Sequence, residues 1–400
     1  MPRIAQTVNV FPMIKHQLKN ISKIVFYLIG GLIILATVSV KNVSASINFS
    51  DCPSPGTICF GNNRNIEYIR GNLPIIISAP HGGYLTPAQI PSRTSGSCGG
   101  GSIITARDIG SQEYTREVAD LIHQSTGRWP HIIINHLHRS RLDANRPISS
   151  AACGSSLAEE AWREFHSAID FAKGLSTNQC GRGHYFDFHT NWHNNANEQY
   201  VEMGNLLVAS QLRFSDLHLD TGLCGGASCV NESSLRSLVR NEGVTLSQAL
   251  RGVNSLGTIL QRRGFRSTPS QQIPSPTGRF FNGGYNTGHH GSKYGGVIDG
   301  TQVETNLYMI NSASGVTSYS RSLAPSILDF LNANYQNFDL RDTDRNGIIC
   351  QVSRVTSSPS PTPPRAGSVT PPPGSSPTPP GGQLPTPTPV RGTYNFPLAQ

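Results

Sequence analysis

The sequence predicts an α/β fold in which helices pack on a mostly parallel sheet. Short apolar runs, the clearest of which is Leu73–Ala79, alternate with longer stretches whose apolar residues recur at helical spacing. This alternation extends from Ser46 to about Tyr335 without an internal repeat. Strands that alternate with helices typically form parallel units. We therefore expect a single α/β domain over residues 46–335.

The elements are assigned in chain order. A strand at 74–80 precedes a helix at 109–125, and a strand at 131–136 precedes a helix that opens with the capping box Ser156-x-x-Glu159 and stops at Gly174. A strand at 183–189 is followed by a helix that is capped by Thr245-x-x-Gln248 and ends before Gly264. A strand at 301–309 and a helix around 326–335 complete the pattern.

Both ends of the chain differ in composition from this domain. Residues 1–23 are basic, residues 24–40 are uncharged and rich in Ile, Leu and Val, and Val43-Ser44-Ala45 offers a cleavage site. This pattern predicts a signal peptide over 1–45, with an uncleaved signal anchor as the alternative. Residues 355–400 are rich in Pro, Ser and Thr, which predicts a disordered tail. We expect an exported protein that is secreted, periplasmic or held at the cell surface.

Cysteine usage and charge agree with export and exclude a nucleic-acid partner. All eight cysteines follow the N-terminal segment, and Cys52–Cys59 and Cys224–Cys229 are close enough to pair locally. The net charge is +8, but five basic residues lie before residue 46 and two lie after residue 354, with no acids in either segment, so residues 46–354 carry only +1. These basic residues are scattered rather than clustered, so we expect no nucleic-acid partner. A membrane partner is expected only through an uncleaved N-terminal segment.

Two histidines and a glutamate stand on predicted strands in a pattern typical of a metal centre. His81 follows the first apolar run, and the strand stops there because Gly82 and Gly83 come next. His189 ends the 183–189 strand, and Glu304 lies within the 301–309 strand. A catalytic zinc site needs three nitrogen or oxygen ligands, an open position for water and a carboxylate that moves the water's protons. The sequence therefore predicts Zn²⁺ with His81 and His189 as ligands and Glu304 as general base and acid.

The order of six short motifs resembles the N-formylglutamate amidohydrolase family over residues 75–310. The motifs are Ser78-Ala-Pro-His81-Gly-Gly, Arg141-Leu-Asp-Ala-Asn145-Arg146-Pro, Trp162-Arg-Glu-Phe-His166, Asp187-Phe-His189-Thr, Arg279-Phe-Phe-Asn-Gly-Gly284-Tyr and Gln302-Val-Glu304. The resemblance implies a zinc-carboxypeptidase-like fold, which is a three-layer sandwich around a mixed sheet with the metal at the strand ends. It also implies that Asp108, which precedes the 109–125 helix, is the third zinc ligand. Glu113 is the alternative ligand.

The resemblance also implies a substrate that carries a carboxylate. Arg146 and Arg141 are expected to bind it through their guanidinium groups, and Arg279 is a further candidate for the carboxylate or the developing oxyanion. Asp187 could orient a ligand imidazole, with solvation or a salt bridge as equal alternatives. The chain departs from related patterns at two positions. Asn282 replaces the family's usual lysine, and Tyr84 replaces the glutamate of a carboxypeptidase His-x-x-Glu motif.

A weaker metal site is predicted after the α/β domain, over 336–354. Asp342, Asp344 and Asn346, followed by Gly347, match the first positions of a calcium-binding loop, whereas position 12 is Ser353. We expect either a weak Ca²⁺ site or a polar turn. The remaining histidines are expected to be structural: those at 131, 136 and 138 on a strand, His166 in helix packing with Trp162, and His289 and His290 in a loop.

Together these observations predict an exported zinc-dependent amidohydrolase. The expected substrate is an acyl-amino acid or a peptide with a free carboxylate, such as a cell-wall peptide, because the export signal argues against a cytoplasmic catabolite. The alternatives are a non-catalytic surface module that retains the fold and a zinc carboxypeptidase-like peptidase, which Tyr84 disfavours.

Overall fold

The computed structural model describes residues 49–350 except 101 and 344–345. The predicted signal segment 1–45 and the predicted tail 355–400 lie outside these residues. The chain divides into one compact unit up to Val352 and a second unit that begins at Ser353. No helix among the described residues is both long and apolar enough to cross a membrane.

A single mixed sheet of eight strands organises the domain, with the order β1-β2-β4-β3-β5-β8-β6-β7. The central strands β4, β3, β5 and β8 pair in parallel, while β1, β2 and β6 join the sheet in antiparallel pairs. The predicted mixed, mostly parallel α/β sheet is therefore confirmed. The strands are β1 (Ile58–Phe60), β2 (Ile66–Ile69), β3 (Ile75–Ala79), β4 (His131–Asn135), β5 (Gly183–Asn191), β6 (Val201–Gly204), β7 (Ser267–Thr268) and β8 (Ile298–Asn306).

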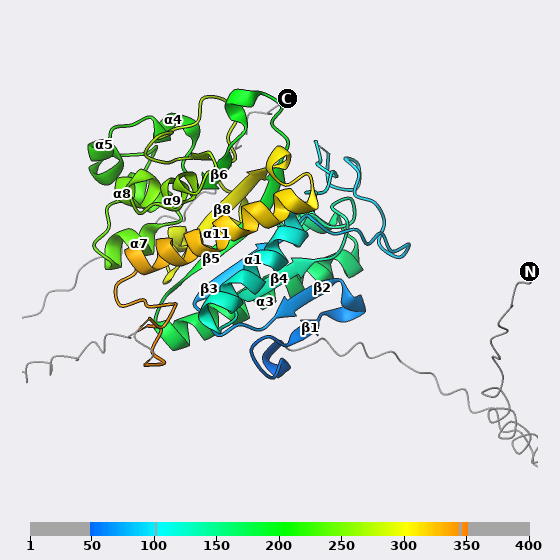
Figure 1. The fold of residues 1–400 in the computed structure, drawn as a ribbon. Coiled ribbons are helices and arrows are strands. Elements are labelled where there is room, and N and C mark those ends of the chain that lie inside the picture. Colours follow the sequence, from blue (N-terminus) through cyan, green and yellow to red (C-terminus); the bar gives the residue numbers. More distant parts are fainter. Residues whose placement is uncertain (1–48, 101, 344–345, 351–400) are drawn as a thin grey trace, which may run out of the picture. The chain divides into compact units, whose positions relative to one another are not determined.

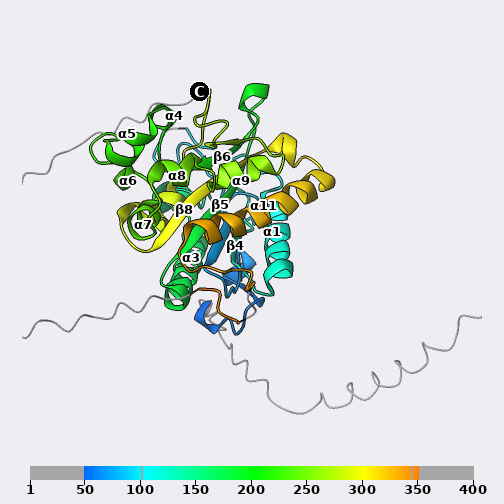
Figure 2. The same cartoon turned by 60° about the vertical axis from the view of Figure 1, so that its left-hand side comes forward.

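Helices cover both faces of the sheet, as Figures 1 and 2 show: α1 and α11 lie on one face and α3 on the other. The larger apolar core fills the first face and the smaller core fills the face under α3. The helices are α1 (Ser111–Thr126), α2 (Ile148–Ala152), α3 (Ser156–Cys180), α4 (Ala209–Leu212), α5 (Asp216–Thr221), α6 (Cys229–Glu232), α7 (Arg236–Asn241), α8 (Leu246–Arg251), α9 (Leu256–Arg262), α10 (Tyr285–His290) and α11 (Ala313–Asn334).

Burial on both sides explains the composition of the central strands. Every residue of β3 and β4 is buried, so these strands consist of nearly continuous apolar residues rather than an alternating pattern. Along β5, Phe186 and Phe188 point into the core under α1 and α11, whereas Tyr185 belongs to the core under α3. Asp187 and His189 lie on the same face as Tyr185, because side chains alternate along a strand.

Two predicted helices have different bounds. Helix α3 continues past Gly174 to Cys180, because Gly174 is exposed and the buried stripe resumes at Ser176. A single glycine on an exposed helix face costs only about 1 kcal/mol and does not end the helix. The predicted capping box at Ser156 is also wrong, since Ser155 is the N-cap residue and its side chain makes no capping hydrogen bond.

The helix predicted from Thr245 is divided in two. The capping box of Thr245 and Gln248 forms as predicted, but α8 ends at Arg251 with Gly252 as its C-cap, and the Ser255 side chain caps a separate helix, α9. The final helix, α11, begins at Ala313 rather than near residue 326. Ser312 caps this start, because its side chain accepts a hydrogen bond from the backbone N–H of Gly315. Strand β8 ends at Asn306, whose side chain accepts a hydrogen bond from the backbone of Tyr308.

Four disulfides pair all eight cysteines. Cys52–Cys59 and Cys224–Cys229 form as predicted, and Cys98–Cys153 and Cys180–Cys350 complete the set. The last of these joins the end of α3 to the segment after α11. Disulfides persist in oxidising compartments, so this set indicates an oxidising environment.

Candidate metal centre

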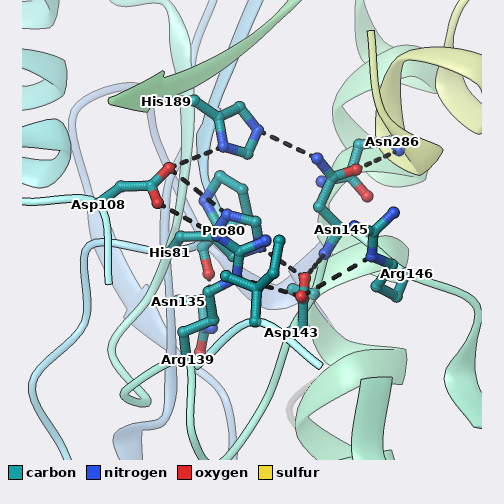
Figure 3. A network of polar contacts seen from close by, with 12 residues as sticks. Pro80, His81, Asp108, Asn135, Arg139, Asp143, Asn145, Arg146, His189 and Asn286 are labelled. Carbon is teal, nitrogen blue, oxygen red and sulfur yellow. Dashed lines mark hydrogen bonds and ion pairs between the residues drawn. The ribbon is translucent and has the colours of Figure 1, made fainter. Parts of the chain in front are cut away.

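His81, Asp108 and His189 converge at the carboxyl ends of β3 and β5. Each side chain is buried, and one possible ligand atom from each lies within 4.8 Å of the others. Both imidazoles turn Nδ1 towards the same oxygen, Asp108 Oδ2, at 3.5 Å from His81 and 2.9 Å from His189 (Figure 3). The structure therefore brings together the two predicted histidines and the aspartate that the resemblance implied.

Local sequence places these three groups. The backbone N–H of Asp108 donates to the carbonyl of His81 at 3.0 Å, which holds the segment before α1 against the end of β3. Gly82 permits this close approach, because a Cβ there would overlap Ser111 and Gln112 at the start of α1. Asp108 does not cap α1; the N-cap position is Gly110, in the left-handed region at φ 83°. The Asp108 carboxylate instead accepts a hydrogen bond from the backbone N–H of Thr190.

A second layer of carboxylates holds the outer nitrogen of each imidazole. His81 Nε2 donates to Asp143 Oδ1 at 2.6 Å, and His189 Nε2 donates to Asp187 Oδ2 at 2.9 Å. An N–H on Nε2 leaves the lone pair of a neutral imidazole on Nδ1. Metal-binding histidines are commonly oriented in this way, with a carboxylate on the far nitrogen. The role suggested for Asp187 in orienting His189 agrees with this contact.

Two further observations indicate that these three side chains could bind a metal cation. His81 Nδ1 is buried and has no hydrogen-bond partner among the described residues, although it faces the carboxylate of Asp108. Four buried carboxylates, Asp108, Asp143, Asp187 and Glu304, also gather here against two largely buried guanidinium groups, Arg93 and Arg139. A divalent cation would provide the missing partner for His81 Nδ1 and would lie among these carboxylates.

The electrostatics of the three groups reflect this crowding. Burial alone would raise the pKa of Asp108, but the adjacent His81 and His189 outweigh it and hold that pKa well below its usual range. Burial alone would lower the pKa of His189, whereas the carboxylates of Asp187 and Asp108 raise it well above its usual value. The site thus favours a positive charge between Asp108 and the imidazoles.

Glu304 stands beside His189 in the sheet. The two residues are direct partners across the parallel strands β5 and β8, so their side chains emerge on the same face. Gln302 Nε2 donates to Glu304 Oε1 at 2.7 Å. Burial raises the pKa of Glu304 to about 8, and the carboxylates of Asp108 and Glu202 add to the shift. A cation at the centre would oppose this rise.

These groups line a cavity of about 550 Å³ whose outer wall carries Trp192, Phe280 and Phe281. Arg146 and Arg139 also line it. Arg146 is half-exposed at the mouth, 3.9 Å from Asp143, so its guanidinium can reach a ligand. Asn282 lies in the same wall.

Two of the predicted substrate arginines, Arg141 and Arg279, are not among the residues that line this cavity. Arg141 turns away from the cavity and donates to the carbonyl of Ile90 at 2.8 Å. Arg279 is 65% exposed and faces Glu198 at 3.9 Å, although its neighbours Phe280 and Phe281 line the cavity. Both arginines lie in segments outside helices and strands, where neighbouring side chains have different surroundings. Glu113, the alternative ligand, is exposed and accepts a hydrogen bond from Tyr84.

Sequence reasoning missed Asp143 and Arg139. Asp143 lies inside the Arg141–Pro147 motif and accepts hydrogen bonds from both His81 and Arg139. Arg139 bridges Asp143 at 3.1 Å and Asp108 at 3.4 Å. The available signal was the aspartate itself, because an acidic residue between Leu142 and Ala144, both buried, needs a charged partner.

The predicted calcium loop stays a prediction. Asp344 lies outside the described residues. The carboxylate of Asp342 accepts hydrogen bonds from the backbone of Gly347 at 2.9 and 3.1 Å, and Asn346 accepts one from Ile348, so these side chains hold a polar turn. His131, predicted to be structural, is buried and bonded to Tyr68 and to the backbone of Gly71.

Comparison with known proteins returned structural neighbours only. No protein-family model and no curated protein matches the sequence. The chain is similar to an N-formylglutamate amidohydrolase from Ralstonia eutropha, with 14% identity, a TM-score of 0.38, and coverage of 66% of this chain and 95% of that one. A gene product of Agrobacterium tumefaciens gives 12% identity and a TM-score of 0.36, covering 68% and 95%. An N-acetylmuramoyl-L-alanine amidase of Nostoc punctiforme gives 13% identity and a TM-score of 0.26, covering 65% and 98%.

The first of these neighbours bears the name of the family whose motifs the sequence resembles. At identities of 12–14%, the geometry of the site carries the functional argument.

Proposed function

We propose that the protein is an exported zinc-dependent amidohydrolase that cleaves an amide bond in an acyl-amino acid or peptide with a free carboxylate. The observation that carries this proposal is the paired arrangement of the two imidazoles. Each points Nδ1 at Asp108 Oδ2 while a separate carboxylate holds its Nε2. Glu304 lies beside them on the same face of the sheet.

His81, Asp108 and His189 would hold the zinc ion. When bound, zinc supplies Lewis acidity and lowers the pKa of a coordinated water. Two nitrogens and one carboxylate oxygen are ligands that suit zinc and leave a position open for water. Asp143 and Asp187 keep the two imidazoles in the tautomer that offers Nδ1.

The chain's own groups provide the proton transfers and the charge complement. Glu304 takes a proton from the attacking water as a bond forms to the carbonyl carbon, and it delivers a proton to the nitrogen as the C–N bond breaks. Arg139 lines the cavity beside the ligands, where its positive charge favours the developing oxyanion. Arg146 at the mouth binds the substrate carboxylate.

The site's position suggests the source of the substrate. The cavity is open at the rim formed by Trp192 and Phe281, which are 64% and 42% exposed. Such apolar surface suits the body of a peptide or acyl chain. The disulfides are typical of a protein in an oxidising compartment, which supports cell-wall peptides as the substrates.

The test is hydrolysis by the zinc-loaded protein of a panel of N-acyl amino acids and peptidoglycan-derived peptides, with Glu304→Gln as the decisive variant. We expect the variant to retain zinc and to lose at least about 100-fold in kcat, since general acid–base catalysis typically contributes that much. Glu113→Gln is the matched control and should leave activity unchanged. A Glu304→Gln variant with wild-type kcat would contradict the proposal.

A further inference from the structure

A second group of histidines lies behind the candidate metal centre, outside the cavity. His166 on α3 and His289 and His290 at the end of α10 each offer a nitrogen, and these atoms lie within 4.8 Å of one another. His166 and His290 are buried, whereas His289 is exposed. The rings of His166 and His290 are stacked, and His166 Nδ1 lies 2.8 Å from His290 Nε2.

The outer nitrogens of the buried pair face oxygen acceptors. His166 Nε2 lies 3.2 Å from the carbonyl of Ala144 and donates to it. His290 Nδ1 lies 3.3 Å from Asp170 Oδ1, an ion-pair contact rather than a formed hydrogen bond. The single N–H of a neutral His166 imidazole therefore lies on Nε2.

The inner nitrogens bond to each other in the metal-free protein. His166 Nδ1 and His290 Nε2 lie 2.8 Å apart, so His290 Nε2 donates to His166 Nδ1. Asp170 does not require the His290 proton, because it accepts from Lys173 at 3.3 Å and its side chain is 58% exposed. His290 Nδ1 is then a buried lone pair without a hydrogen-bond partner among the described residues, and a cation would supply that partner.

The third histidine completes a ligand set on the solvent side. The His289 ring centroid lies 4.8 Å from that of His290 and 5.6 Å from that of His166, and the ring stacks on Tyr285. Three neutral imidazoles suit Zn²⁺, Cu²⁺ or Ni²⁺ and are poor ligands for Ca²⁺ or Mg²⁺. The exposed His289 also gives an ion a route from solvent.

We propose that His166, His289 and His290 form a second site for a divalent transition metal ion, which ties α10 to α3. This site does not depend on the function proposed above. Its neighbours connect it to the first centre. Ala144, which accepts from His166, precedes Asn145, and the backbone of Asn286 on α10 donates to Asn145 Oδ1 at 2.8 Å. Asn145 Nδ2 in turn lies 3.2 Å from His189 Nε2. A metal ion here would fix the segments that support the first site.

The test is the zinc stoichiometry of the full-length protein, measured by calorimetric titration and by metal analysis after dialysis. His289→Ala is the main variant, because this exposed side chain can be removed without opening the core. His218→Ala, which removes another exposed histidine, is the matched control. His189→Ala removes a ligand of the first centre instead.

We expect two zinc ions per wild-type or His218→Ala chain and one per His289→Ala chain. The zinc ion that His289→Ala loses should be the one that His189→Ala retains. The His189→Ala, His289→Ala double variant should therefore bind no zinc. When cobalt replaces zinc, the His189→Ala variant should show a visible absorption band from the second site. The His189→Ala, His289→Ala double variant should lack this band. A wild-type chain whose bound zinc is unaffected by His289→Ala, whether it binds one ion or two, would overturn the proposal.

Discussion

The two histidine groups differ in what holds their outer nitrogens. In the candidate metal centre, the buried carboxylates of Asp143 and Asp187 accept from both imidazoles. In the second group, His166 is held by a backbone carbonyl, and His290 faces Asp170, whose side chain is 58% exposed. Buried carboxylates raise the basicity of a ligand more than a carbonyl or a solvated carboxylate does. We infer that the first site binds zinc more tightly and is more rigid.

Removing a ligand from the first centre should have the largest effect. His81→Ala takes away one of three donors and leaves Asp143 without its imidazole partner. We expect the affinity of the first site for zinc to fall by more than about 100-fold, because even the loss of an outer partner costs 10–100-fold. Hydrolysis should fall below detection. Retention of one zinc per chain at wild-type affinity in a His81→Ala, His289→Ala double variant would contradict the assignment.

The outer carboxylates test the comparison most sharply. Asp187→Asn should weaken zinc binding at the first site about 10–100-fold, since the amide cannot accept as strongly from His189 Nε2. Asp170→Asn should weaken binding at the second site by less than about 10-fold, because an exposed ion pair contributes little. Competition with a chelator of known affinity measures both constants. Equal losses at the two sites would show that burial of the carboxylate is not what separates them.

Substrate binding separates the sites in another way, because only the first opens into the cavity with an arginine at its mouth. Arg146→Gln should raise KM for carboxylate-bearing substrates about 10-fold, the value of one charge-assisted hydrogen bond, with kcat little changed. Arg279→Gln is the control, since that side chain is solvent-exposed and lies away from the cavity. Steady-state kinetics on acids and their methyl esters would check this. An equal KM change with the ester would exclude carboxylate binding by Arg146.

The smallest effect concerns α3, the helix that carries His166. Burial raises the pKa of Glu164 to about 7, although its carboxylate accepts from the backbone of Asn62 at 2.7 Å. Because the folded pKa exceeds the unfolded one, this group's contribution to stability is present below about pH 4.5 and is lost as pH rises through 7. Glu164→Gln removes that loss. We expect the variant's Tm relative to wild type to rise by about 2–4 °C between pH 5 and pH 8 in metal-free protein. A pH-independent difference would refute the assignment.

Sequence patterns predicted the parts of the fold and site that depend on local order. The apolar runs located β3 and β4, because strands buried on both faces consist of nearly continuous apolar residues. Aromatic and β-branched residues located β5 and most of β8, although both strands also carry buried polar side chains. The two short cysteine loops were predicted from spacing alone. The short outer strands β1, β2, β6 and β7 were missed, since strands of two to four residues carry too little pattern.

The rest depends on contacts between distant segments. No spacing rule brings His166 beside His290, which is 124 positions away, or joins Asp108 to His189 across 81 positions. Arg141 and Arg139 illustrate the same limit: they are two residues apart in a loop, and only the path of that loop decides which of them reaches the carboxylates.

The most direct measurement is a crystal structure of the zinc-loaded protein with anomalous data collected on both sides of the zinc absorption edge. We predict a peak at about 2.0–2.2 Å from His81 Nδ1, His189 Nδ1 and a carboxylate oxygen of Asp108, the distances that zinc takes to nitrogen and oxygen ligands. Absence of a peak at this position in well-ordered, zinc-saturated crystals, or ligation through the Nε2 atoms, would contradict the account.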